Sequence, residues 1–193
     1  MPPRLLALLL TLPLGLATVA AHAAPRTHDE LYLRAGLGGG VALGALASPG
    51  GDSDSRGANV ATELAVGWTF RPGLVLGVGT FPMVAPGPSY SAVDAGGQHT
   101  SATGPFVDYY FDPRGGLHAQ GGLLFAAGYL DGGEREGVVG LGYGAMVGVG
   151  YDAFVTDQWS VGGLARVTAS RLEGVDDHLS LASPSLLVTV TYH

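Results

Sequence analysis

The chain alternates apolar residues with polar or small residues at a period of two. In residues 60–71 most of the apolar side chains fall on one face, whereas Glu63 and Arg71 lie on the other face. The same alternation recurs in 117–129, 139–151 and 186–193, and more weakly in 31–41, 74–80, 107–111 and 159–169. A period of two is typical of β-strands whose two faces meet different surroundings.

These segments predict eight strands. We expect them at about 30–43, 58–70, 74–84, 100–111, 117–130, 138–152, 159–171 and 179–192. Most are long enough to cross a bilayer as tilted strands, which need about 9–11 residues. Pro82, Pro86 and Pro88 fall at the end of the third strand, which is therefore the weakest prediction of the eight.

The first four connections alternate in length. Residues 48–59 and 83–98 are long and polar, whereas 71–73 and 112–116 are tight turn sequences rich in Gly, Pro and Asp. Short turns at one end and long loops at the other are typical of outer-membrane barrels. We therefore expect the turns, and both ends of the barrel chain, on the periplasmic side.

The first residues are typical of a secretory signal peptide. Arg4 precedes an apolar stretch, and Ala21-His22-Ala23 is a small-x-small cleavage site, so we expect residues 1–23 to be removed. An uncleaved anchor fits less well because the apolar run is short. No later stretch offers 18 consecutive apolar residues. Residues 24–193 therefore predict one barrel domain, since lipid is crossed only by helices or closed barrels.

Composition excludes several kinds of site. The 193 residues include no cysteine, which excludes disulfides, CxxC pairs and cysteine-ligated metals. The formal net charge of −7 argues against a nucleic-acid partner. The glycine-rich runs at 36–40 and 140–144 open no predicted helix, and the six histidines have no metal-binding spacing. We expect no cofactor and no metal.

Aromatic residues gather at the predicted turn end. Besides Tyr32 and Phe154, the expected aromatic girdle there consists of Trp68, Phe70, Tyr109, Phe111, Tyr151, Trp159 and Tyr192. A thinner group toward the loop end consists of Phe81, Phe125, Tyr129 and Tyr143. Aromatic girdles at both membrane interfaces are a feature of transmembrane barrels.

These features together resemble the small eight-stranded outer-membrane β-barrels of Gram-negative bacteria, of the OmpA-membrane-domain and OmpX type within the porin-like superfamily. The last strand is similar to the signal that the barrel-assembly machinery reads, through Leu186, Val188, Val190 and Tyr192. Tyr192 is penultimate here, whereas the family ends on an aromatic residue. The resemblance implies an all-β, eight-stranded antiparallel up-and-down transmembrane barrel. It also implies a monomer in the bacterial outer membrane, in contact with its lipid and lipopolysaccharide.

The inward face of the predicted barrel carries charge. It supplies Arg34, Glu63, Asp108, His118 and Arg166, together with Gln120. Side chains just fill an eight-stranded barrel, and charges in that environment must pair. We expect a lumen polar network joining the two carboxylates to the two arginines as structural filling. A gate or a proton-conducting chain is the alternative.

Acidic residues dominate the predicted outer loops. They are Asp52, Asp54, Asp94, Asp131, Glu134, Glu136, Glu173, Asp176 and Asp177, opposed by Arg56 and Arg135, with Arg171 near the edge. This acidic crown favours a structural or surface-interaction role through the loops, without catalysis. A narrow ion or small-solute channel is the second hypothesis. A soluble lipocalin-like barrel, with apolar residues inside, is a further one.

One group of residues favours an enzyme. His178 and Ser180 form a His-x-Ser pair near Glu173, and a serine nucleophile needs a histidine base and an orienting carboxylate. Outer-membrane lipid A deacylases carry such a pair and a Glu on their outer surface. The pair here lies at a loop edge and lacks their Asn-rich surroundings. A lipid A-modifying hydrolase is therefore the least favoured hypothesis.

Overall fold

The computed structural model describes residues 28, 31–47, 52–86, 89–90, 97–131, 137–174 and 178–193. The predicted signal peptide lies outside these residues. The strands are β1 (Leu31–Ala47), β2 (Ser53–Arg71), β3 (Leu74–Thr80), β4 (Met83–Pro86), β5 (Ser89–Tyr90), β6 (Gly97–Tyr110), β7 (Leu117–Asp131), β8 (Gly137–Phe154), β9 (Trp159–Glu173) and β10 (His178–Tyr192).

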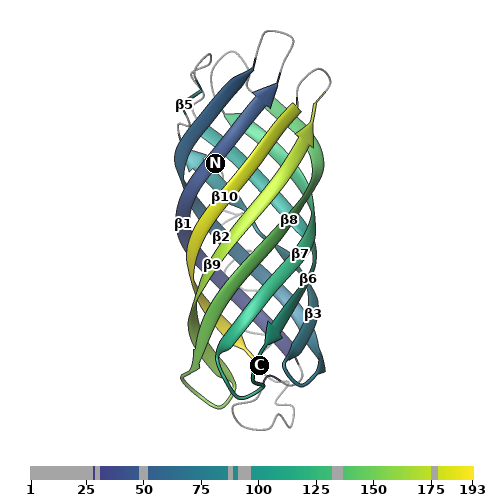
Figure 1. The fold of residues 1–193 in the computed structure, drawn as a ribbon, viewed down its shortest axis with the longest axis vertical. Helices are drawn as coiled ribbons and strands as arrows, with labels where there is room; N and C mark the ends of the chain where they lie inside the picture. Colours follow the sequence, from purple (N-terminus) through teal and green to yellow (C-terminus); the bar gives the residue numbers. More distant parts are fainter. Residues whose placement is uncertain are drawn as a thin grey trace, which may run out of the picture.

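The strands close into one tilted antiparallel ring (Figure 1). From β1 the order is β10, β9, β8, β7, β6, β3 and β2, and β2 pairs with β1 again. β4 continues β3, because both bridge β2 and β6. The ring therefore has eight members, as the alternation predicts. Within the described part of the chain, no helix is long and apolar enough to cross a membrane.

The two ends of the barrel differ. Residues 72–73, 111–116 and 155–158 connect strands at what we call the turn end, which also holds His193 and is the lower end in Figure 1. The opposite end is the loop end. Gly73 has a φ of 80°, which glycine adopts without strain, so 72–73 can close the two-residue turn between β2 and β3.

The predicted third strand is divided. Residues 81–82 separate β3 from β4 within the expected range 74–84. Pro82 cannot donate a ladder hydrogen bond, but its carbonyl accepts one from Thr62 N at 2.9 Å. Phe81 N donates to Ala102 O at 2.7 Å. The wall therefore remains hydrogen-bonded to both neighbours at the break.

The predicted loop at 48–59 is mostly strand, which is a correction. β2 begins at Ser53, and its alternation continues with Ser55 and Asn59 buried and Asp54 and Arg56 exposed. The polar composition indicated a loop. A strand whose outer face meets water carries the same residues, so composition alone does not separate the two.

The barrel is apolar outside and polar inside. Leu64, Val147, Leu186 and Val188 are exposed on the outer face, each by more than 60%. The inward face of the same strands buries polar groups, Glu63 among them. This is the reverse of the arrangement that a soluble lipocalin-like barrel requires.

Six members of the predicted aromatic girdle are exposed near the turn end: Trp68, Phe70, Tyr109, Phe111, Tyr151 and Trp159. The seventh, Tyr192, packs edge-on against Trp159 with ring centroids 5.2 Å apart. Tyr32 does not belong to this outer girdle, because it is fully buried in the lumen. Tyr32 does lie near the turn end, as its position at the start of the strand predicted. Its side chain points into the lumen because Tyr32 and Arg34 are two residues apart, and such residues share one face of a strand. Phe81 is also buried, for the same reason of parity.

Candidate functional site in the lumen

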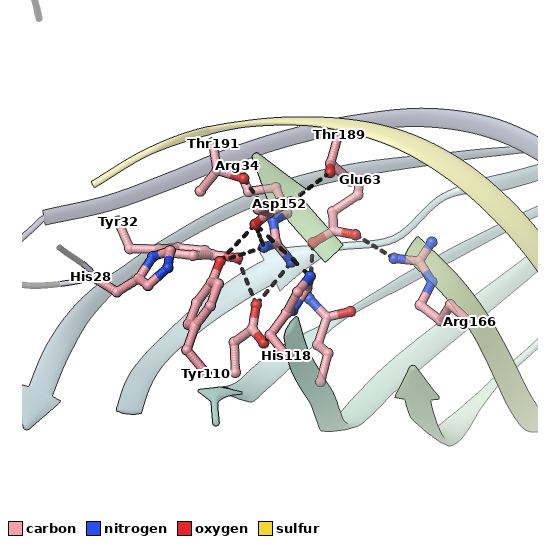
Figure 2. A network of polar contacts seen from close by, with 12 residues as sticks. His28, Tyr32, Arg34, Glu63, Tyr110, His118, Asp152, Arg166, Thr189 and Thr191 are labelled. Atoms are coloured by element: carbon pink, nitrogen blue, oxygen red, sulfur yellow. Dashed lines mark hydrogen bonds and ion pairs between the residues drawn. The ribbon is translucent and has the colours of Figure 1, made fainter. Parts of the chain in front are cut away.

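The floor network is a group of buried side chains at the turn end of the lumen: Arg34, Asp108, Tyr110, His118 and Asp152 (Figure 2). Arg34 extends from β1 across the lumen. Its Nη1 lies 2.8 Å from Asp108 Oδ2 on β6, and its Nη2 lies 2.8 Å from Asp152 Oδ2 on β8. One guanidinium thus joins three strands through two carboxylates.

Neighbouring side chains donate further hydrogen bonds to the two carboxylates. Tyr110 Oη donates to Asp152 Oδ2 at 2.8 Å, and Tyr32 Oη donates to Asp108 Oδ2 at 2.9 Å. His118 Nδ1 lies 2.7 Å from Asp108 Oδ1, so this nitrogen carries a proton. Buried charges are stable only when they are paired and hydrogen-bonded, and both carboxylates of this group meet that condition.

A second ion pair lies above the floor network. Arg166 Nη1 on β9 donates to Glu63 Oε2 on β2 at 2.7 Å. Gln120 Nε2 on β7 donates to the other carboxylate oxygen at 3.0 Å. The Arg166 guanidinium also lies over the Phe81 ring, 5.1 Å from its centroid. Strands on opposite sides of the barrel are therefore joined across the lumen at two levels.

All the predicted lumen residues are buried in one polar column, Arg34, Glu63, Asp108, His118, Gln120 and Arg166. The pairs are Arg34 with Asp108 and Arg166 with Glu63. Asp152 was expected at the end of the strand 138–152, but it was not predicted as a member of the lumen network. Its parity with Gly150 and Met146 on the inward face of β8 was a signal that would have placed it in the lumen.

A second cluster, which we call the histidine clasp, consists of His28, His193 and Ser160 at the turn end. His28 Nε2 lies 2.9 Å from Gly115 O, so this nitrogen carries the proton of a neutral ring. His28 Nδ1 then accepts from His193 Nδ1 at 2.9 Å. His193 Nε2 in turn accepts from Ser160 Oγ at 2.9 Å. The Gly115 carbonyl thus determines the direction of the whole chain of hydrogen bonds.

Burial keeps both clasp histidines neutral. Loss of hydration lowers the pKa of His28 from 6.5 to about 4. Burial also lowers the pKa of His193 from 6.5 to about 2, and the neighbouring His28 adds to this shift. His28 stacks on Tyr110 with ring centroids 3.4 Å apart, which connects the clasp to the floor network. The sequence analysis gave His28 no role, because it precedes the first alternating segment.

The His-x-Ser pair lies outside the lumen. His178 and Ser180 are exposed on the outer face of β10 near the loop end. The strand register pairs His178 with Glu173 and Ser180 with Arg171 on β9. The three residues of the hydrolase hypothesis are therefore neighbours on the outer surface, and Arg171 Nε lies 3.8 Å from Glu173 Oε1.

Part of the predicted acidic crown is described. Asp52, Asp54 and Glu173 are exposed at the loop end. Outside the residues with described side chains lie Asp94, Asp131, Glu134, Arg135, Glu136, Asp176 and Asp177. Among the described side chains, no three His, Asp or Glu residues are arranged to hold a metal ion.

Known structures share this architecture. Neisserial surface protein A has 18% sequence identity with this chain and a TM-score of 0.54, over 84% of this chain and 96% of that one. Outer membrane protein AlkL, solved in DMPC lipid bilayers, has 12% identity and a TM-score of 0.50, over 89% and 93% of the two chains. No protein-family model and no curated protein matches the sequence. The chain therefore has the fold of the small eight-stranded outer-membrane β-barrels.

Proposed function

We propose that this protein is an integral outer-membrane β-barrel whose role is structural or surface contact through its loop end, without catalysis. Residues 1–23 serve as the export signal in this proposal. The single observation that carries it is the inversion of polarity, with apolar side chains outside and ion pairs inside. An outer face of this kind is stable in lipid and would aggregate in water.

Membrane integration is tested by gel mobility. The protein is extracted from isolated outer membranes and run in SDS with and without boiling. We expect a compact, SDS-resistant band that shifts on boiling, because a closed barrel has no free strand edge. A single unshifted band, with the protein in the soluble fraction, would refute the proposal.

In this proposal the lumen is structural filling. The described lumen contains an enclosed cavity of about 20 Å³, lined among others by Thr100, Arg166 and Ser183. A space of this size holds about one water molecule. We therefore expect no conductance above background in planar bilayers. Reproducible single-channel steps would favour the alternative of a narrow ion or small-solute channel.

The proposed contact surface is the acidic crown. Asp52, Asp54 and Glu173 are exposed there: Asp52 precedes β2, Asp54 lies near its start, and Glu173 ends β9. Such a surface is suited to cation-bridged contact with lipopolysaccharide. The assay is binding of the refolded barrel to lipopolysaccharide vesicles with calcium and with a chelator. We expect the chelator to weaken binding, and equal binding in both conditions would contradict the cation bridge.

A further inference from the structure

The outer wall has a groove along β9. It has a volume of about 630 Å³ and is lined by residues of β8, β9, β10 and β1, including Gly39, Val149, Ala165, Pro184 and Leu186. The register aligns Gly39 with Leu186, Leu186 with Ala165, and Ala165 with Val149 across these four strands. We call this feature the β9 groove.

Short side chains follow the β9 groove toward the loop end. Toward the loop end from Val167, the next outward residues are three alanines that lie side by side. They are Ala182 on β10, Ala169 on β9 and Ala145 on β8. Alanine side chains are too short to close the groove. A row of short side chains therefore lies between the β9 groove, which ends at Val167, and Arg171, the next outward residue of β9.

Three hydrogen-bond donors lie side by side just beyond the row of alanines. The register pairs Ser180 with Arg171 and Arg171 with Tyr143, and all three are exposed on the outer face. Arg171 Nε lies 3.8 Å from Glu173 Oε1, which is too long for a hydrogen bond. A guanidinium flanked by two hydroxyls is suited to a phosphate group.

The height of this donor row fits a membrane interface. Tyr143 is paired with Phe125, and these two exposed aromatics belong to the girdle nearer the loop end. Arg171 lies six positions after Ala165, which corresponds to about 20 Å along a strand. At a tilt of about 45° this is about 14 Å along the membrane normal, close to one leaflet of a hydrocarbon core about 30 Å thick.

We propose that the β9 groove holds one phosphate-bearing acyl lipid of the loop-end leaflet. An acyl chain lies along Gly39, Ala165 and Ala169, and the phosphate contacts Arg171, Ser180 and Tyr143. This inference depends on the proposed membrane location, and it adds a defined lipid site to it.

Two other outer grooves are useful comparisons. They have volumes of about 700 and 690 Å³ and share Ala35, Leu64 and Val190 on the wall around β1. Exposed Val60 lies between them and Arg56, the outward cation of β2. Arg56 is paired with exposed Leu43 on β1, where Arg171 is paired with the hydroxyl-bearing Ser180 and Tyr143, so Arg56 serves as the control for Arg171.

The first test compares lipids. The refolded barrel in detergent is titrated with dipalmitoyl phosphatidic acid and with dipalmitoylglycerol, which has the same acyl chains without the phosphate. Bound lipid is counted by native mass spectrometry. We expect one phosphatidic acid to be retained, and Arg171→Gln to weaken its binding about tenfold, since hydrogen bonds to charged groups are worth at least that factor. Arg56→Gln should leave binding unchanged.

The second test fills the groove. Ala165→Phe should reduce retention of phosphatidic acid by a similar factor, because the ring occupies the space of the acyl chain. Val78→Phe is the control, since Val78 is exposed on β3, opposite β9 in the ring. Equal binding of the two lipids, or equal effects of a variant and its control, would mean annular lipid contact only and would overturn the site.

These experiments distinguish failure of the proposed lipid site from failure of the proposed outer-membrane barrel. Every variant is first run with and without boiling in SDS. A heat-modifiable barrel that retains no phosphatidic acid refutes only the lipid site. A barrel that is not heat-modifiable refutes the proposed function itself.

Discussion

The two halves of the lumen are stabilised in different ways. At the turn end, the floor network holds two carboxylates whose four oxygens all have partners, with Thr189 completing Asp152. Toward the loop end, the upper lumen holds apolar side chains, including Leu46, Leu172, Leu179 and Leu181, together with uncharged polar ones such as Asn59 and Ser183. The upper lumen also contains the small cavity near Thr100.

The difference shows how polar groups are satisfied in a narrow barrel. In the floor network both carboxylates meet several donors. Arg34 Nη1 there is ion-paired with Asp108 without a hydrogen bond, and His118 Nε2 has no hydrogen-bond partner. In the upper lumen Thr100 Oγ1 and, beside it, Arg166 Nε have no protein hydrogen-bond partner. A void large enough for one water adjoins both residues. Removing a partner should therefore be costly where it leaves a buried charge unpaired, as in the floor network, and cheap at an uncharged group such as the Thr100 hydroxyl.

The largest effect is expected from Asp152→Ala. This change leaves the buried Arg34 with one carboxylate fewer and removes the acceptor of Tyr110. We expect the free energy of unfolding to fall by roughly 3–5 kcal/mol, the range for breaking a buried ion pair. The measurement is urea unfolding in lipid vesicles, followed by gel mobility. Asp52→Ala, an exposed carboxylate at the loop end, is the control, and equal effects of the two would contradict the distinction.

Leu172→Ala should destabilise the barrel by roughly 3 kcal/mol, because it leaves a cavity in a fully buried site of the upper lumen. The same urea titration measures it. Leu186→Ala is the matched control on the outer face, where lipid fills the space that the side chain leaves. An outer-face effect as large as the lumen effect would show that packing inside the upper lumen is loose.

The clasp makes the turn end sensitive to acid. Between pH 6.5 and about 4 the unfolded chain binds protons that His28 does not bind when folded, and the window extends to about 2 for His193. The free energy of unfolding should therefore be highest above pH 6.5 and fall with pH, with His28 alone contributing about 3 kcal/mol of the loss at pH 4.

Unfolding of wild type and His28→Gln at pH 7 and pH 4.5 measures this contribution. The variant has no ionisable group at this position, so its pH dependence should be weaker. An unchanged pH dependence in His28→Gln would contradict the role of the clasp in acid sensitivity.

The smallest effect is expected from Thr100→Val. The substitution removes a buried hydroxyl that lacks a protein partner and keeps the side chain's shape. Stability should stay within about 1 kcal/mol of wild type, or rise. Tyr32→Phe in the floor network is the comparison, because it removes a donor to Asp108 and should cost about 1.5–3 kcal/mol. Equal costs in one unfolding series would remove the contrast between the two halves.

Much of the fold was predictable because the period of two is local. The alternation predicted the outward face of β8 and the inward positions of Glu63 and Asp108. The division of the third strand was only partly predictable. Pro82 indicated weakness, but the hydrogen bond from Thr62 that keeps the wall closed depends on a distant strand.

The candidate site was predictable in its members more than in its contacts. Parity placed Arg34 and Asp108 in the lumen, and the need to pair buried charge predicted an ion pair. Which charges meet depends on strand tilt and stagger, which bring Asp152 from β8 beside Arg34 from β1. The clasp was not predictable, because His193 ends the alternating segment 186–193 whereas its partner His28 precedes the first alternating segment.

The sequence by itself determined the strand number, the apolar outer face and the charged interior, because side-chain alternation is a property of each strand alone. The tertiary structure decided the partners of the described lumen charges, the directions of the hydrogen bonds in the clasp and the lining of the β9 groove. These features depend on the register between strands that are distant in sequence. Closure of the ring sets that register, and no single strand contains it.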